Sequence, residues 1–381
     1  MLAEATESTS GDSVANRSLV QDVHLLPGGF GFESSRTYSV PLDAELFGNV
    51  TFVTPRPPND IINGTAQLSL SIRFDDGAMM HDVMHSLLQE PRGSFEQLSA
   101  TMFPMVFALR SLRKMPPSDQ VQQLQHRASA YLESGLQKLR QRIHTNGAFG
   151  FFRNPSIEMT ALGVRLFATL RQVPMSSIKY LLSHLTPSLD LRRRAIAMHA
   201  IVMANHGSMI MDEQYSALAG AMRRSDPPKS AWNVLFGRSK KRGKENKDKD
   251  DAFVVALAAR TLWRAGRHLG VAKELSKQLE LWQDNDGIVR GPHHPQTLTR
   301  SGRRDAQTEV TALAALVWES LANSKANASV ALHRAISALR AREERNGRFG
   351  STQATTLALE AIDAFSDAQV SLQGVLLNVT V

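Results

Sequence analysis

The feature that most constrains the fold of this chain is a long central block of helix-forming sequence, from residue 77 to residue 367. Within it, apolar residues recur at three- and four-residue spacing in segments separated by Pro, Gly, Ser and Asp, which is the pattern of amphipathic helices. About a dozen helices are expected. Their expected starts lie near Gly77, Ser94, Ser118, Ile157, Met175, Asp190, Asp212, Asp251, Gly270, Asp305, Ala328 and Thr352. So many consecutive helices predict a mainly α fold of paired helices, either an open solenoid or a closed α/α toroid of about six hairpins.

Recurring turns favour the closed toroid. Gly147–Gly150 and Gly347–Gly350 share the pattern Gly-x-Phe-Gly, and Asp286–Val289 is a weaker third copy. Glycines let the backbone turn tightly, and an aromatic ring can anchor such a turn in the core. Their repetition along the chain predicts repeated helical hairpins.

Sequence on both sides of the helical block is typical of β-strands. Residues 19–76 include Val50–Thr54, which is β-branched and aromatic, and Ala66–Phe74, which alternates polar and apolar residues. Residues 368–381 have the same strand-like pattern. We therefore predict one small β domain, split into residues 19–76 and 368–381, with the toroid of residues 77–367 inserted between its parts. Residues 1–18 are mostly small and polar and predict a disordered tail.

Composition excludes several classes of protein. The 381 residues contain no cysteine, which excludes disulfide frameworks, zinc ribbons, iron–sulfur clusters and a cysteine nucleophile. The net charge of +8 is modest for this length. The longest apolar stretch, Ala195–Ala204, is about half the length that a membrane-spanning helix needs. The first residues lack the apolar core of a signal peptide.

N-glycosylation patterns indicate a secretory or extracellular setting. The pattern Asn-x-Ser/Thr occurs five times, at Asn16, Asn49, Asn63, Asn327 and Asn378. Such acceptor sites are glycosylated only in proteins that enter the secretory pathway. Chance occurrence in a chain rich in Ser and Thr remains the alternative interpretation.

The most specific motif is Pro91–Gln97, with the sequence PRGSFEQ. It resembles the thioester region of the alpha-macroglobulin and complement family, in which Pro-x-Gly-Cys-x-Glu-Gln opens a helix and the Cys thiol is joined to the Gln side chain. Further stretches resemble the same family in the same order, and the resemblance covers residues 37–381. These stretches are Asn146–Phe152, Met159–Gly163, Thr297–Gly302, Glu309–Leu313 and Asn346–Thr355.

This resemblance implies a thioester-domain toroid inserted in a CUB-type β domain, with other macroglobulin domains of a longer parent chain as its neighbours. It implies a degenerate thioester site at Ser94, Phe95, Glu96 and Gln97, because Ser94 stands where the family has cysteine. A hydroxyl is a far weaker nucleophile than a thiolate near neutral pH. We therefore expect no thioester and no covalent trapping of targets.

In the family, a histidine well downstream of the cysteine can assist acyl transfer. His199 and His206 lie in the corresponding part of this chain, although neither lies in a motif that matches the family. Since no thioester is expected here, a structural role on a helix face or at a helix end is the favoured interpretation for both.

Three other patterns allow alternative functions. His81 and His85, spaced i, i+4 around Asp82, resemble part of a zinc site but lack a third ligand. Asp284 and Asp286 could serve as a carboxylate pair of a glycosidase, although they lie in one of the recurring turns. The charged run Arg238–Asp251 is expected to be a solvated loop rather than a polyanion-binding arm. His293 and His294 are expected to lie in a loop.

The sequence therefore favours a non-enzymatic macroglobulin-like protein or fragment. It is expected to contribute to endopeptidase inhibition or innate-immune recognition through non-covalent contacts with proteins, either proteases or surface proteins. No metal, cofactor, nucleic acid or membrane span is expected. The alternative is a toroid enzyme that acts on sugars or small molecules, which would require a cavity lined by facing carboxylates.

Overall fold

A computed structural model describes residues 88–115, 117–151, 154–223, 248, 250–298, 302–322, 329–344 and 347–366. All of them belong to one compact unit. The predicted tail, both predicted parts of the β domain, the pair His81 and His85, and all five glycosylation patterns lie outside the described residues.

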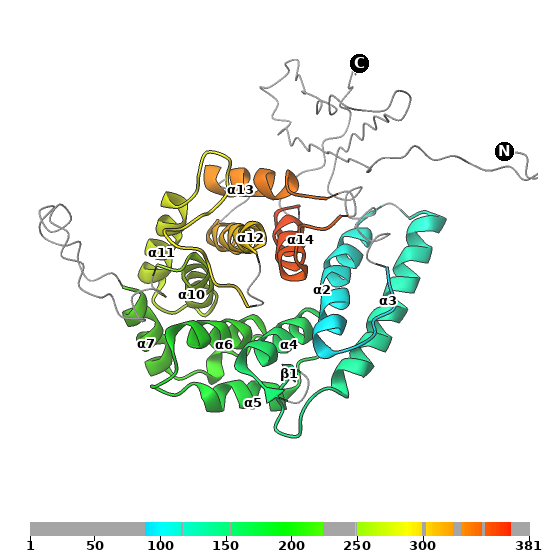
Figure 1. The fold of residues 1–381 in the computed structure, drawn as a ribbon, viewed down its shortest axis with the longest axis horizontal. Coiled ribbons are helices and arrows are strands. Elements are labelled where there is room, and N and C mark those ends of the chain that lie inside the picture. Colours follow the sequence, from blue (N-terminus) through cyan, green and yellow to red (C-terminus); the bar gives the residue numbers. More distant parts are fainter. Residues whose placement is uncertain are drawn as a thin grey trace, which may run out of the picture. The chain divides into compact units, whose positions relative to one another are not determined.

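Six helices form an inner ring (Figure 1). They are α2 (Phe95–Leu112), α4 (Ile157–Thr169), α6 (Leu191–Met203), α10 (Ala252–Arg264), α12 (Arg303–Leu321) and α14 (Thr352–Ser366). Each contacts the next, and α14 contacts α2, which closes the ring. The inner helices are buried almost all round: in α10, every residue from Ala252 to Leu262 is buried. The predicted mainly α fold, an α/α toroid, is confirmed.

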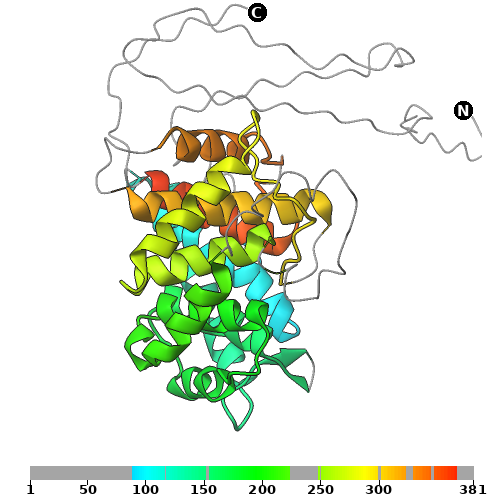
Figure 2. The ribbon, with the colours of Figure 1, turned by 90° about the vertical axis from the view of Figure 1, so that its left-hand side faces the viewer.

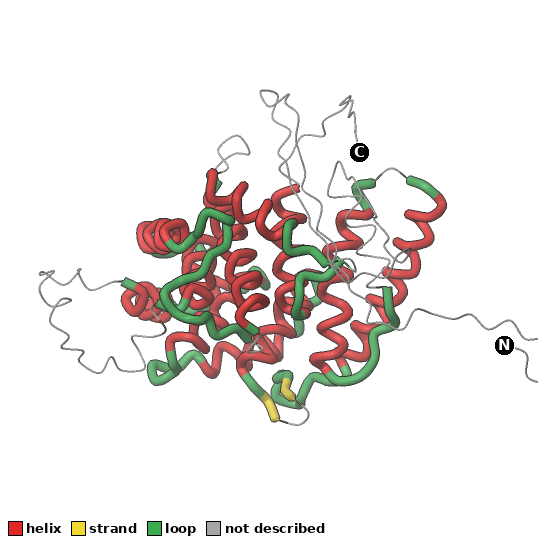
Figure 3. Tube along the Cα trace, turned by 45° about the horizontal axis from the view of Figure 1, so that its top comes forward, coloured by secondary structure: helices red, strands yellow, loops and turns green. Residues whose placement is uncertain are grey.

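Five helices alternate with these in the chain and lie outside the ring (Figures 1 and 2). They are α3 (Asp119–Arg140), α5 (Met175–His184), α7 (Asp212–Met222), α11 (Leu269–Leu281) and α13 (Val330–Arg340). Each buries only one stripe of apolar residues, such as Val121, Leu124, Leu132 and Leu136 in α3, as a surface helix does. The remaining described elements are η1 (Gly207–Met209) and a hairpin of β1 (Gly150–Phe151) and β2 (Asn154–Pro155) (Figure 3).

Contacts between first turns show that α4, α6 and α10 begin at one end of the ring, and that α12 and α14 begin beside each other. Glu158 of α4 pairs with Arg193 of α6 at 2.9 Å. Arg192 of α6 pairs with Asp251, the N-cap of α10, at 3.3 Å. The Asp305 carboxylate of α12 accepts a hydrogen bond from the amide of Ser351, just before α14, at 2.9 Å.

The three recurring turns have the same structure, so the weaker third copy is confirmed. Gly147, Gly287 and Gly347 all have positive φ values, of 87°, 84° and 70°, which favour glycine. In each turn, a backbone amide two residues after this glycine donates to a threonine hydroxyl of an inner helix at 3.0 Å. The three threonines are Thr160, Thr311 and Thr355. The turns therefore dock onto the inner ring through one repeated hydrogen bond.

One expectation is wrong at its last residue. The charged run Arg238–Asp251 is expected to be a solvated loop; residues 238–247 and 249 lie outside the described residues, but Asp251 is 5% exposed. Its carboxylate accepts hydrogen bonds from the amides of Phe253 at 2.9 Å and Gln296 at 3.1 Å. It caps α10 and holds the loop that precedes α12, so the helix begins where the run ends.

Candidate functional site

Ser94 and Gln97 meet at the start of α2. The Gln97 side-chain oxygen accepts a hydrogen bond from the Ser94 amide at 2.9 Å, and the Ser94 hydroxyl accepts one from the Gln97 amide at 3.4 Å. These reciprocal bonds form a capping box, which satisfies two of the free amides at a helix N-terminus. The pattern Ser-x-x-Gln predicts this cap directly from the sequence. The serine and the glutamine therefore have a structural role whatever chemistry the site performs.

Gly93 provides the space that Gln97 occupies. Its φ is +93°, and a Cβ added there would lie 1.9 Å from Gln97 Oε1 and 2.9 Å from Gln97 Cδ. Any other residue would therefore force the carboxamide away from the Ser94 amide. The hydrogen bond from the Ser94 amide to the Gln97 side chain therefore requires a glycine at position 93.

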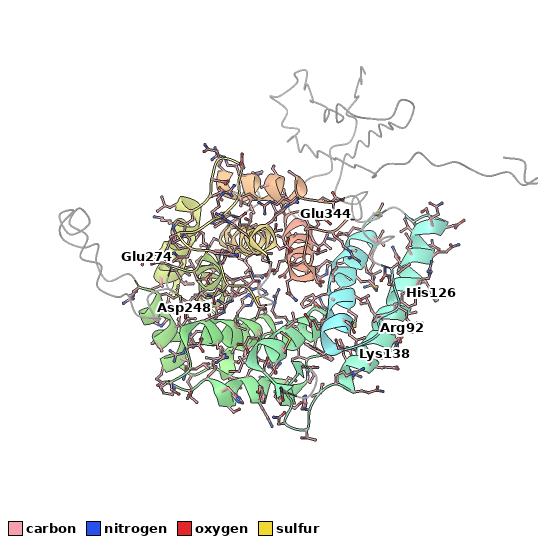
Figure 4. The ribbon with its side chains drawn as sticks, viewed as in Figure 1. Arg92, His126, Lys138, Asp248, Glu274 and Glu344 are labelled. Carbon is pink, nitrogen blue, oxygen red and sulfur yellow. The ribbon has the colours of Figure 1, made fainter. Side chains whose placement is uncertain are left out.

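Two basic residues of the α3 hairpin hold the loop before the site. Lys138 Nζ donates to Pro91 O at 2.9 Å and pairs with Glu90 Oε1 at 3.0 Å. Beyond the end of α3, Arg142 Nη2 donates to Gly93 O at 2.9 Å. Figure 4 shows Lys138 and Arg92 at this edge of the ring. Hydrogen bonds and charge from Arg92 and Lys138 lower the pKa of Glu90. Sequence reasoning missed these contacts, because their partners Pro91 and Gly93 lie 47 and 49 residues earlier in the chain.

Phe95 connects the site to one of the recurring turns. Its ring is buried and stacks on Phe149, with centroids 4.6 Å apart and an angle of 29° between the planes. Phe149 in turn contacts Phe167, with centroids 5.9 Å apart. By contrast, Glu96 and Gln97 are exposed and Ser94 is half-buried. The site is therefore anchored by one aromatic side chain and otherwise open to solvent.

The structure does not place either candidate histidine among the partners of Ser94. His206 follows the C-terminus of α6, and a helix of this length separates its ends by about 20 Å. His199 points into the axis of the ring and is 1% exposed. Burial, together with the charges of Arg165, Arg260 and Arg264, lowers its pKa well below the usual value. His199 is therefore neutral and far better placed for a structural role than for work at Ser94.

The ring axis carries a second polar cluster that sequence reasoning did not anticipate. Glu360 of α14 pairs with Arg165 of α4 and with Arg260 of α10, both at 2.8 Å. Burial alone would raise the pKa of Glu360, but the charges of Arg260 and Arg165 outweigh it and lower the pKa. Both arginines are less than a tenth exposed. One carboxylate thus links three inner helices across the axis.

The other candidate residues from the sequence lie in turns and loops. The carboxylate of Asp284 accepts a hydrogen bond from the Ile288 amide at 2.8 Å and pairs with Arg290, so it stabilises its turn, as the turn interpretation predicts. Asp286 lies in the same turn, and His293 and His294 lie in an exposed loop. Within the described part of the chain, no group of three or more His, Asp or Glu side chains could hold a metal ion. No described helix has the length and apolar character to cross a membrane.

The fold and the motif at α2 together define a thioester-domain type of α/α toroid, and comparison with protein families agrees. The model of the A-macroglobulin TED domain, the thioester-containing domain, matches residues 70–365. The chain therefore belongs to the A-macroglobulin TED domain family.

One solved structure shows the same fold at low sequence identity, and a second is similar to this chain over a comparable share. A mutant of Salmonella alpha-2-macroglobulin is 12% identical with a TM-score of 0.50, and the match covers 77% of this chain and 18% of that protein. The native conformation of Escherichia coli alpha-2-macroglobulin is 15% identical with a TM-score of 0.48, over 75% of this chain and 17% of that protein. The chain thus spans less than a fifth of the length of these macroglobulins.

Proposed function

We propose that this chain is the thioester-domain part of an alpha-macroglobulin-like protein in which a serine cap has replaced the thioester. The supporting observation is the geometry of Gly93, Ser94 and Gln97. The glycine leaves space for the carboxamide, which folds back to the start of the helix, but the side chain at its partner position is a hydroxyl. With no cysteine in the chain, the carboxamide has no thiol to acylate.

The consequence is a protein that contacts its targets without bonding to them. A thioester forms when a cysteine thiolate attacks the glutamine carboxamide and ammonia leaves. A serine hydroxyl is scarcely ionised near neutral pH and is a poor nucleophile without a neighbouring base. Neither His199 nor His206 lies among the partners of Ser94 that the structure describes. We propose non-covalent endopeptidase inhibition or innate-immune recognition as the role, and not catalysis.

The remaining parts of the proposal follow from the family. Residues 19–76 and 368–381 would form the flanking CUB-type β domain. The partners would be proteases or surface proteins and the other macroglobulin domains of a longer chain, in an extracellular or secretory setting. Glycosylation would occur at Asn16, Asn49, Asn63, Asn327 and Asn378. The axial cavity described below gives no support to the alternative of a toroid enzyme, because it is the size of one water molecule.

Intact-mass spectrometry after exposure to methylamine tests the proposal. We expect the wild-type protein to have the full mass of its sequence and to gain no methylamine at Gln97. The Ser94→Cys variant supplies the thiol in a site that is otherwise arranged for it. We expect this variant to lose the mass of one ammonia when the thioester forms and then to take up methylamine at Gln97.

Ser94→Ala is the matched control, because it removes the hydroxyl without providing a thiol, and it should behave as the wild type does. Methylamine at Gln97 of the wild-type protein would contradict the proposal. If Ser94→Cys folds but does not react, then the site has lost more than its nucleophile, and the idea of a single replacement is wrong.

A further inference from the structure

A small cavity lies on the axis of the ring, among the polar side chains described above. It is lined by residues of five inner helices and by Leu298 of the loop before α12. Its polar lining consists of Arg165, His199, Glu309 and Gln353. The space open to the centre of a water molecule is about 10 Å³, which is close to the minimum that one internal water requires.

Two of these side chains direct unpartnered polar atoms at the cavity. His199 Nε2 and Gln353 Oε1 are both buried and have no hydrogen-bond partner in the protein. Their residues are 1% and 5% exposed, respectively. A buried polar atom without a partner lowers the stability of the folded protein, so two of them beside one polar cavity indicate a ligand.

We propose that the axial cavity binds one internal water molecule, which links His199 of α6 to Gln353 of α14. The chemistry of the lining selects a neutral ligand. A bare anion would face the Glu309 carboxylate, and a bare cation would face the Arg165 guanidinium. The Gln353 oxygen requires a hydrogen-bond donor, and the Arg165 guanidinium can only donate. A molecule that both donates and accepts, and that fits this volume, is water.

A water at this site would connect two inner helices that do not contact each other. His199 and Gln353 lie on helices that are not neighbours in the inner ring, since α6 contacts α4 and α10 while α14 contacts α12 and α2. Glu360 already links α4, α10 and α14 through ion pairs. The water adds α6 to this set of connected helices, so that polar contacts cross the axis in more than one direction.

A high-resolution crystal structure and oxygen-17 magnetic relaxation dispersion of the full chain test this site together. We expect one well-ordered water within hydrogen-bond distance of His199 Nε2 and Gln353 Oε1. We also expect a dispersion contribution from a long-lived internal water. In the Gln353→Met variant, which keeps the side-chain length but removes the acceptor, we expect the density of this water to be lost. We expect the dispersion to fall by the contribution of one water, since a protein of this size holds other internal waters.

Gln125→Met is the matched control, because Gln125 lies on outer helix α3 and bonds to Leu112 O at 2.9 Å, away from the cavity. It should keep the dispersion contribution. His199→Leu supplies a second test from the other side of the cavity and should also lose it. A wild-type map without density at this position would overturn the proposal. So would a dispersion amplitude that is unchanged from the wild type in both Gln353→Met and His199→Leu.

Discussion

The start of α2 and the axis of the ring are both polar, but they are built from partners at very different distances along the chain. At the start of α2, Ser94 and Gln97 are three residues apart and open to solvent. At the axis, Glu360 meets Arg165 and Arg260 across 195 and 100 residues. The two arginines are buried, and the Glu360 side chain is 13% exposed. The first site depends on a local backbone geometry, whereas the second exists only when the ring is closed.

This difference explains how the chemistry of the α2 site can change while the fold persists. A local, exposed contact contributes little to stability, and a serine caps a helix as well as any residue does. A buried charge that loses its partner is far more costly. Under the proposal that Ser94 has replaced a thioester cysteine, the exchange would therefore cost little stability, while the axis tolerates few single changes.

The largest expected effect is at the axis. The Glu360→Leu variant leaves two buried guanidinium groups facing each other without their shared carboxylate. We expect the free energy of unfolding to fall by about 3–5 kcal/mol, measured by urea denaturation. The exposed Glu274→Leu change on α11 is the matched control and should stay within about 0.5 kcal/mol of the wild type.

Replacing all three charged residues at once tests whether unpaired buried charge causes the loss of stability in Glu360→Leu. The combined Arg165→Met, Arg260→Met and Glu360→Leu variant should regain part of the stability lost in Glu360→Leu, because it also removes the two guanidinium groups that lost their shared carboxylate. If Glu360→Leu is no less stable than Glu274→Leu, then the axial ion pairs do not stabilise the ring as described.

The second expected effect is a dependence of stability on pH that arises from His199 at the axis. His199 has a pKa well below its usual value in the folded protein because it is buried beside Arg165, Arg260 and Arg264. Glu309 and Glu360 are the acidic groups that face the same region. As the pH falls below about 6.5, the unfolded state binds a proton that the folded state does not, so the folded state loses stability.

We expect a slope of up to about 1.4 kcal/mol per pH unit from this one group. Urea denaturation of the wild type between about pH 7 and pH 5.5, before most carboxylates titrate, measures it. The lowered pKa of Glu360 adds a loss of the same sign only at lower pH, below about 4.5. The His199→Leu variant should lack the slope in the upper range, and an unchanged slope there would rule out His199 as its source.

The smallest expected effect is at the start of α2. Ser94→Ala removes one side-chain cap and should lower the free energy of unfolding by about 1 kcal/mol. Ser156 caps α4 in the same way, accepting from the Met159 amide at 3.0 Å, so Ser156→Ala should cost a similar amount. A much larger loss of unfolding free energy for Ser94→Ala would mean that Ser94 makes stabilising contacts beyond the helix cap.

Much of the fold could be predicted because its signals are local. Helix starts at Ile157, Met175, Asp212 and Thr352 follow from spacing and breakers, and the structure places helices at these residues. The repeated turns could be identified because Gly147, Gly287 and Gly347 each need a positive φ. The pair Ser94 and Gln97 was found from its resemblance to a family motif, and its Ser-x-x-Gln spacing also indicates the capping box that it forms.

The axis could not be predicted by such reasoning. Nothing near Glu360 in the chain shows that its partners lie on α4 and α10. The position of His199 could not be predicted either. An inner helix of a ring is buried on all sides, so its sequence has no amphipathic pattern that shows which residues face the axis. Asp251 was assigned to a solvated run for the same reason, because its partners Arg192 and Gln296 are distant in sequence.

By itself, therefore, the sequence determined the alternation of helices, the three turns and the absence of a thiol at position 94, since each depends on neighbouring residues or on composition. Only the tertiary structure decided which polar groups share the axis and which side of Ser94 is open to solvent. The physical reason is that a closed ring brings together helices far apart in the chain, and burial then sets the charge state and the energetic weight of each group.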